Sequence, residues 1–231
     1  LIKNGEIVDY KHQLLRINSK IKPDPVIEEE IDEIIKPHHN KLNEVIGYTE
    51  TALNRNLVLE STMDNFLLKS LLNLTGAEIA FSNGWRYGAP VVPGPITRND
   101  LWNIIPVNPP VSTVELTGAE LLEMMEENLE RTFSRDPYQQ MGGYVKRVKG
   151  INLYFKIENP AGRRIQRLFV QGKLVDPDEI YNAVYVTSQG VPMKYGSNRH
   201  TLDIKAVENL ERFLHEKKKI SAELQGSITA V

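Results

Sequence analysis

The chain has 231 residues, a net charge of −2 and 25% charged side chains, a composition typical of a globular protein with one large domain or one domain plus an extension. The near-neutral charge excludes a general attraction to nucleic acid or to a membrane surface, and no apolar run reaches transmembrane length. The absence of cysteine excludes disulfides, thiolate catalysis and cysteine-ligated zinc.

The first part of the chain is expected to form strands and then a helix. Asn4-Gly5 between short apolar runs is typical of a hairpin turn, and residues 1–22 are predicted to form strands. Pro25 favours a helix start, because isoleucines at helical spacing and a run of acidic residues follow it. Pro37 should interrupt this helix, and a weaker helical pattern continues to Val45.

Farther along, helices alternate with strands and strands then dominate. Ser61, Thr97 and Thr117 each precede an acidic residue by three positions, which indicates helix starts. This pattern predicts an α/β fold of the α+β-like kind, with a mixed rather than all-parallel sheet packed by helices. The expected helices are 61–75, 97–105, 117–133 and 203–217, and the expected strands are 77–81, 111–116, 144–157, 165–171 and 180–188.

The sequence carries no recognisable catalytic centre. None of the five histidines belongs to a metal-binding motif, and His38-His39 lies in a polar stretch where a solvated pair is favoured over a ligand pair. A nucleophile elbow, a P-loop and a dinucleotide-binding glycine motif are all missing from the sequence. We therefore predict neither a catalytic residue nor a metal site in this chain.

The most informative segment is Phe81-Ser82-Asn83-Gly84-Trp85-Arg86-Tyr87-Gly88, which follows a predicted buried strand. Ligands of α/β folds often bind just beyond strand ends. The planar guanidinium of Arg86 suits phosphate or sulfonate oxygens, and the glycines let backbone N–H groups approach an anion. A surface turn in which Arg86 stacks on a neighbouring aromatic ring is the alternative, and the residues alone leave both open.

Two later loops are further candidates for a pocket wall. Asp136-Pro137-Tyr138-Gln139-Gln140-Met141-Gly142-Gly143 combines two amides and a tyrosine with a glycine pair. Ser188-Gln189-Gly190-Val191-Pro192-Met193-Lys194-Tyr195-Gly196 follows a predicted strand. An ordinary helix-to-strand connection and an ordinary surface loop are the respective alternatives.

A series of short motifs adds a family resemblance. Over about residues 44–215, their order and spacing resemble the C-terminal domain of the 5'-nucleotidase family. The motifs are Ala77-Glu78-Ile79-Ala80-Phe81-Ser82-Asn83-Gly84, Gly94-Pro95-Ile96-Thr97, Asp100-Leu101-Trp102, Ile105-Pro106, Val114-Glu115-Leu116-Thr117-Gly118-Ala119-Glu120-Leu121, Gly172-Lys173-Leu174-Val175-Asp176 and Tyr181-Asn182-Ala183-Val184.

The resemblance implies a domain organisation. In that family an N-terminal metallophosphoesterase domain holds two metal ions, and a helix links it to a C-terminal domain that binds substrate. Residues 1–22 would then be the last strands of the metallophosphoesterase domain, 23–45 a linker helix and 46–231 the substrate-binding domain. The start at Leu1 rather than Met also suggests a piece of a longer protein.

Cofactors, partners and location follow from the same resemblance. It implies two divalent metals, such as manganese or zinc, in the preceding domain and none bound by this chain. The expected partners are that N-terminal metallophosphoesterase domain and an anionic small-molecule substrate or a cysteine-linked carrier protein. Neither a nucleic acid polymer nor a membrane span is expected, and the family implies a periplasmic or extracellular location.

The sequence departs from the nucleotidases of this family at the base-binding positions. Where they carry a stacking phenylalanine after a proline, Pro106 is followed by Val107. The segment expected to hold the second aromatic residue is Thr187-Ser188-Gln189-Gly190. The comparison with the family therefore implies that both faces of a base clamp are lost, and stacking contributes on the order of 1–3 kcal/mol per base.

One branch matches the loops better. Asn83-Gly84-Trp85-Arg86-Tyr87-Gly88, 136–143 and Val145-Lys146-Arg147-Val148-Lys149-Gly150 are similar to segments of SoxB-type sulfur-oxidation hydrolases. Those enzymes cleave a sulfate group from a cysteine-linked sulfur carrier protein. In that branch the arginine matching Arg86 lies in the substrate site and can contact the anion.

Three functions follow as hypotheses. In the first, the chain is the substrate-binding domain of a metal-dependent hydrolase and is inactive alone. The second is a true nucleotidase that stacks its base on Trp85 or Tyr195, and the third is a non-catalytic protein-binding domain with an exposed apolar patch around 91–93. In the first hypothesis Arg86 binds the phosphate or sulfate ester, and the pocket is shaped by Asn83, Gly84, Trp85, Tyr138, Gln140, Gly142 and Gly143.

Overall fold

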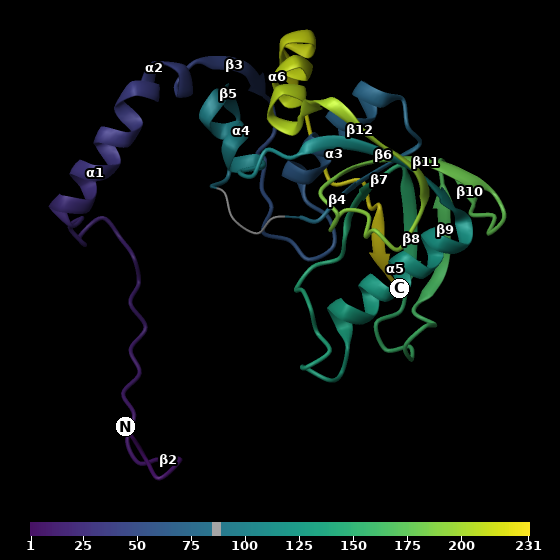
Figure 1. Cartoon of the computed structure of the whole chain (residues 1–231), viewed down its shortest axis with the longest axis horizontal. Coiled ribbons are helices and arrows are strands. Elements are labelled where there is room, and N and C mark those ends of the chain that lie inside the picture. The colour runs from purple at the N-terminus through teal and green to yellow at the C-terminus, as the bar shows by residue number, and fades with distance from the viewer. Residues whose placement is uncertain (85–88) are drawn as a thin grey trace. The chain divides into compact units, whose positions relative to one another are not determined.

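The computed structural model describes residues 1–84 and 89–231. The chain divides into two compact units, Leu1–Asn40 and Lys41–Val231. Figure 1 shows the elements of both units in chain order. The helices of the described residues include none that is long and apolar enough to cross a membrane.

The first unit contains a hairpin followed by a helix. Strands β1 (Ile2–Lys3) and β2 (Glu6–Ile7) pair antiparallel across Asn4-Gly5, whose φ values of 52° and 80° are those of a tight hairpin turn. Helix α1 (Pro25–Ile35) begins after an aspartate cap. The hairpin and the helix start are confirmed. The expectation of strands throughout 1–22 is wrong for 8–22, because that stretch has no strand to pair with in the described chain.

The proline interruption is also confirmed. Helix α1 gives way to a single 3₁₀ turn, η1 (Lys36–His38), and to the one-turn helix α2 (His39–Leu42). The expected weaker helical pattern continues as α2 but ends at Leu42 instead of Val45, because Val45 begins strand β3 (Val45–Thr49). That strand pairs with two others, β5 (Gly94–Thr97) and β13 (Lys219–Ile220), so tertiary pairing overrides a weak local pattern.

A five-stranded mixed sheet forms the centre of the second unit (Figure 1). Its strand order is β12-β6-β11-β4-β7. Strands β11 (Ile180–Val186) and β4 (Ile79–Ser82) pair in parallel, and the other neighbours pair antiparallel. The mixed α/β fold predicted from the sequence is confirmed. The remaining strands are β6 (Pro110–Thr117), β7 (Arg147–Lys149) and β12 (Ser197–Lys205).

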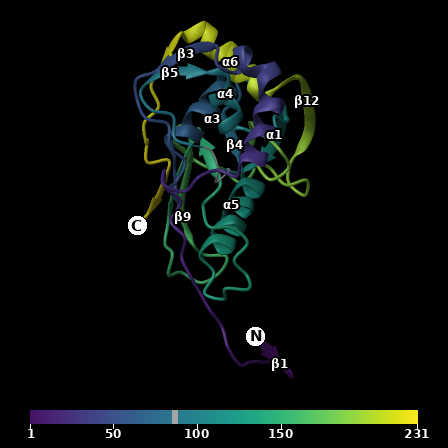
Figure 2. The same cartoon turned by 90° about the vertical axis from the view of Figure 1, so that its left-hand side faces the viewer.

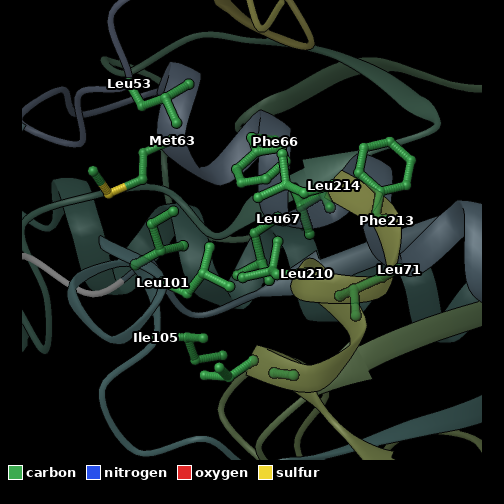
Figure 3. Packing of buried hydrophobic residues seen from close by; sticks show 14 of the residues in the cluster. Leu53, Met63, Phe66, Leu67, Leu71, Leu101, Ile105, Leu210, Phe213 and Leu214 are labelled. Carbon is green, nitrogen blue, oxygen red and sulfur yellow. The ribbon is translucent and has the colours of Figure 1, made fainter. Parts of the chain in front are cut away.

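Side chains of this sheet alternate between two separate cores, as the two-residue period of a strand requires. Val184 and Val186 of β11 belong to the first core, with helices α3 (Thr62–Thr75), α4 (Arg98–Ile104) and α6 (Ala206–Lys217). Figure 3 shows Phe66 and Leu67 gathered with Leu210 and Phe213 in this core.

The second core lies on the other face of the sheet. Ala183 and Tyr185 of β11 pack there with helix α5 (Gly118–Phe133) and with a four-stranded sheet of order β10-β9-β8-β14. Figure 2 shows α5 and β9 together, away from α3, α4 and α6. The strands of this sheet are β8 (Ile151–Phe155), β9 (Ile165–Val170), β10 (Lys173–Leu174) and β14 (Ile228–Ala230).

The helix starts follow the predicted capping residues. Thr97 with Asp100, and Thr117 with Glu120, form reciprocal capping boxes, and Ser61 accepts a hydrogen bond from the backbone N–H of Asp64. The last helix, expected from about residue 203, begins only at Ala206. The preceding residues belong to β12, a largely polar edge strand whose bulged pairing with β6 gives little periodic signal.

A buried carboxylate fastens the last strand to the body of the second unit. Glu60 is 8% exposed and accepts hydrogen bonds from the backbone N–H groups of Gln225 (2.8 Å) and Gly226 (2.8 Å). It also accepts one from the side-chain amide of Asn65 (2.6 Å). The carboxylate of Glu60 therefore binds both the segment just before β14 and the first turn of α3.

We expect Glu60→Gln to lower the free energy of unfolding by about 2 kcal/mol, because a charge-assisted acceptor of several buried donors is lost. Glu50→Gln is the matched control, since the exposed Glu50–Lys219 pair should contribute less than about 1 kcal/mol. Urea unfolding of both variants, with amide exchange at 228–230, measures the difference. Equal costs for the two substitutions would contradict the role of Glu60.

Candidate functional site

A pocket of about 350 Å³ lies in the second unit, where the parallel strands β4 and β11 end. Parallel strands end at the same edge of a sheet, so the loops after them come together there. One wall is the inner face of α5, and another is the segment that leads into β7. Its polar lining consists of Asn83, Glu127, Asn128, Arg131, Thr132, Tyr144, Lys146, Ser188 and Gln189, and its remaining lining consists of Met124, Met141, Gly142 and Pro192.

Asn83 connects the loop after β4 to the loop after β11. Its Nδ2 donates to Oε1 of Gln189 at 2.7 Å. Its Oδ1 is buried and has no hydrogen-bond partner in the described part of the chain. A buried acceptor without a donor is costly, so this oxygen is suited to accept a hydrogen bond from a ligand.

Gly84 is required by its surroundings. Its φ of 63° lies in the left-handed region, and a Cβ at this position would lie 2.8 Å from both Cγ and Nε of Arg147. The same Cβ would lie 3.1 Å from the ring of Tyr144. The chain therefore passes directly over a buried arginine before it reaches residues 85–88.

Two buried arginines share one carboxylate beneath this loop. Asp64 lies 3.1 Å from Nε of Arg147 through one oxygen and 3.0 Å from Nη2 of Arg55 through the other. All three side chains are at most 3% exposed. Burial lowers the pKa of Arg147, and the nearby carboxylate opposes this effect. The three groups carry one excess positive charge, which favours anions nearby.

Lys146 is a pocket residue that the sequence analysis did not single out. The residue is 7% exposed, and its Nζ donates to the backbone oxygens of Gln189 (2.6 Å) and Gly190 (2.8 Å). Burial lowers the pKa of Lys146 to about 8, and Glu127 of α5 opposes this shift. The sequence analysis included Lys146 only as part of the segment 145–150 that is similar to SoxB-type hydrolases, and it gave this lysine no role of its own.

The structure places only some of the predicted site residues at the pocket. Asn83 and Gly142 line the pocket, and Gly84 supports the adjoining loop. Trp85 and Arg86 lie outside the described residues, so their predicted roles stay predictions.

The other three predicted residues are not among those that line the pocket. The side chain of Tyr138 is 93% exposed. Gln140 donates through Nε2 to the backbone oxygen of Ser134 at 2.8 Å, which stabilises the connection after α5. Gly143 is exposed and does not belong to the lining.

The features behind the two alternative functions are placed differently from expectation. Tyr195 is 3% exposed, and its hydroxyl bonds to Glu127 at 3.0 Å, so its ring does not offer a free face for a base. Val91 is 5% exposed and pairs through its backbone with Leu53, whereas Val92 is 70% exposed. The predicted apolar patch at 91–93 therefore lacks its first member.

We expect Gly84→Ala to destabilise the chain by about 2 kcal/mol or more, because the added methyl group needs a left-handed backbone and displaces Arg147. Gly142→Ala is the control within the same pocket region. A Cβ there meets nothing within 4 Å, and φ is not positive, so its cost should stay below about 0.5 kcal/mol. Thermal unfolding of both variants tests this, and comparable melting temperatures would refute the strained packing at Gly84.

The stability of the chain should depend on pH through Lys146. Between its folded pKa of about 8 and the unfolded value of roughly 10.4, the folded chain binds fewer protons than the unfolded chain. The free energy of unfolding therefore rises with pH in this window, by on the order of 2 to 3 kcal/mol, and below the window this group gives it no pH dependence. Lys146→Met should lack this rise, whereas exposed Lys173→Met should keep it. Urea unfolding at pH 7 to 10 measures this. If the free energy of unfolding changed with pH equally in wild type and in Lys146→Met, the assignment would be contradicted.

Two curated proteins are similar to this chain in sequence. The chain is 26% identical over 166 residues to the trifunctional nucleotide phosphoesterase protein YfkN of Bacillus subtilis (strain 168), covering 68% of this chain and 11% of that protein. It is 25% identical over 185 residues to a 5'-nucleotidase of Diplobatis ommata, covering 72% of this chain and 31% of that protein. The chain thus spans less than a third of either curated relative.

Two solved structures share the fold. The 5'-nucleotidase precursor of Thermus thermophilus superposes with a TM-score of 0.81 and 23% identity, over 98% of this chain and 47% of that one. The sulfate thiohydrolase SoxB of the same organism, in complex with glycerol, superposes with a TM-score of 0.80 and 23% identity, over 90% of this chain and 39% of that one. The family model described as the 5'-nucleotidase C-terminal domain matches residues 42–188, more than half of the chain. The chain belongs to the 5'-nucleotidase C-terminal domain family.

Proposed function

We propose that this chain is the substrate-binding part of a longer metal-dependent hydrolase and that it positions an anionic phosphate or sulfate ester. The observation that carries this proposal is the pocket after β4 and β11, where Lys146 and Arg131 face a space bordered by the unpaired Oδ1 of Asn83. The names of the relatives, a nucleotide phosphoesterase, a 5'-nucleotidase and a sulfate thiohydrolase, all denote hydrolases that act on anionic groups.

The charges around the pocket support an anionic ligand. Glu127 is the one carboxylate among the described lining residues, and it already accepts from Arg131 (2.7 Å) and Lys194 (3.0 Å). The ammonium of Lys146 and the excess charge of the Arg55–Asp64–Arg147 cluster then leave the site positive. An anion gains charge-assisted hydrogen bonds there, and a donor group on the same ligand can satisfy Asn83.

The proposal assigns the metals to another domain. In residues 1–84 and 89–231, no three histidine, aspartate or glutamate side chains gather closely enough to hold a metal ion. These residues therefore do not fit a dinuclear site. Two divalent ions, such as manganese or zinc, and the hydroxide that they activate would belong to the preceding metallophosphoesterase domain. The contribution of this chain is binding and orientation.

The first unit fits the role of a connection to that domain. Helix α1 carries isoleucines and a valine that are 48–71% exposed at Val26, Ile27, Ile31 and Ile34. Such an apolar stripe is normally covered. We propose that residues 1–22 belong to the preceding domain and 23–45 link it to 46–231, with export to the periplasm or cell exterior as in the family.

The base-binding positions favour a sulfur conjugate over a nucleotide as the substrate. Val107, at the position of the first stacking residue, is an exposed aliphatic side chain, and Tyr195 is buried. A cysteine-linked carrier protein is the corresponding partner. The curated relatives named for nucleotides keep AMP as the second candidate.

The full-length parent, expressed with manganese, tests these substrates directly. We expect sulfate release from a thiosulfonate–cysteine conjugate, with little phosphate release from AMP. Arg86→Ala should lower kcat/KM on the order of 100-fold, because the anion loses its proposed guanidinium partner. Arg163→Ala is the control, since that side chain is exposed and distant from the pocket lining.

Phosphate release from AMP that collapses in Arg86→Ala would establish a nucleotidase instead. If the parent protein released neither product, the function would shift to protein binding. The 231-residue chain alone should release neither product when manganese is added, and turnover by it would overturn the assignment of catalysis to another domain.

A further inference from the structure

The turn after β11, residues 187–190, has a strained backbone. Thr187 has a φ of 63°, which a β-branched residue rarely adopts. Its Oγ1 is buried and has no hydrogen-bond partner in the part of the chain that is described. The turn closes through the N–H of Gly190, which donates to the oxygen of Thr187 at 3.0 Å. Such a conformation persists only when its surroundings hold it.

One ammonium binds the far end of this turn. The Nζ of Lys146 lies 2.6 Å from the oxygen of Gln189 and 2.8 Å from that of Gly190, so two successive carbonyls of the turn converge on it. Lys146 is itself anchored, because its backbone N–H donates to Oδ1 of Asn128 on α5 at 2.7 Å. The turn is therefore tied to the helix that forms the opposite wall of the pocket.

The same turn carries the contact that orients Asn83. Oε1 of Gln189 accepts from Nδ2 of Asn83, which leaves Oδ1 of Asn83 as the unpaired acceptor. We infer that Lys146 is a positioning residue, which holds the strained 187–190 turn so that Gln189 orients the Asn83 amide for the ligand. This inference rests on the proposed function only in taking the pocket as the ligand site.

The charge of Lys146 is the sensitive part of this arrangement. Among the residues that the structure describes, the charged groups that act on it are Glu127 and Arg131, both on α5. Residues 187–192 and 82–84 contribute no titratable side chain. Because its pKa is lowered to about 8, the ammonium loses a proton in mild base. The neutral amine keeps two N–H groups, but its hydrogen bonds to the turn are no longer charge-assisted and should weaken.

The test uses the whole chain with Lys146→Met, which keeps most of the length of the side chain and removes its donors. Replacing a buried charge by an apolar side chain seldom prevents folding. We expect hydrogen exchange at the N–H of Gly190 to quicken on the order of tenfold or more, and the side-chain amide signals of Asn83 and Gln189 to move. In wild type the Thr187 methyl signal should titrate with a midpoint near pH 8, and in Lys146→Met it should not.

The absence of native cysteine allows a specific rescue. Lys146→Cys, alkylated with 2-bromoethylamine in the unfolded state and refolded, regains an ammonium at nearly the original distance. Slow exchange at Gly190 should return. Lys149→Met and alkylated Lys149→Cys are controls three residues along the chain, since the Nζ of Lys149 bonds to Gln225 instead of the turn. Unchanged exchange at Gly190 in Lys146→Met, or equal quickening in Lys149→Met, would overturn the inference.

Inorganic phosphate, which near neutral pH carries anionic oxygens and a P–OH donor that can reach Oδ1 of Asn83, then links the turn to the pocket. We expect its dissociation constant to rise on the order of tenfold in Lys146→Met and also in Gln189→Met, which keeps the ammonium and removes the acceptor that orients Asn83. Unchanged phosphate affinity in Gln189→Met would overturn the step from the turn to the ligand. Absence of phosphate binding in wild type would count against the proposed function, whereas the exchange measurement, which needs no ligand, would still decide whether Lys146 holds the turn.

Discussion

The parallel pairing of β4 with β11 is the constraint on which the rest of the second unit depends. Ala183 pairs with Ile79 and Tyr185 with Phe81, although about a hundred residues separate the two strands in the sequence. The pairing places the loops after both strands at one edge and gives the sheet two buried faces. A pocket between these loops is a direct consequence of that register, because a shift of one residue would exchange the two faces.

The charges around that edge are arranged in an unusual way. Arg55, Arg147 and Lys146 are buried cations, and Asp64 is the one buried carboxylate that pairs with any of them among the described residues. Backbone oxygens accept further hydrogen bonds from two of these cations. The oxygens of Leu57 and Val58 accept from Arg147, and those of 189–190 accept from Lys146. Carbonyl dipoles stabilise a cation without cancelling its charge. The loops therefore keep a defined shape while the site remains positive.

Local sequence signals predicted the helices well and the site only in part. Ser61, Thr97 and Thr117 marked helix starts because a capping side chain acts within one turn. Strand β12 and the short strands β5, β13 and β14 escaped prediction, because two to four residues carry no periodicity and a polar edge resembles a loop. Asn83 was identifiable from its place after a buried strand. The buried environment of Lys146 was not identifiable from the sequence, since it is created by a turn more than forty positions away.

The attachment of β14 has a consequence for the order of folding. This strand lies parallel to β8, with Ile228 opposite Leu153, and Glu60 gathers the N–H groups just before it. During synthesis, β8 can pair with β9 early, but its other edge stays open until residues 228–230 have been made. Contacts between such distant positions form slowly, and an open strand edge invites pairing with other chains. A nascent chain is thus exposed to edge pairing at β8 until β14 has been made, and the arrival of β14 removes that exposure.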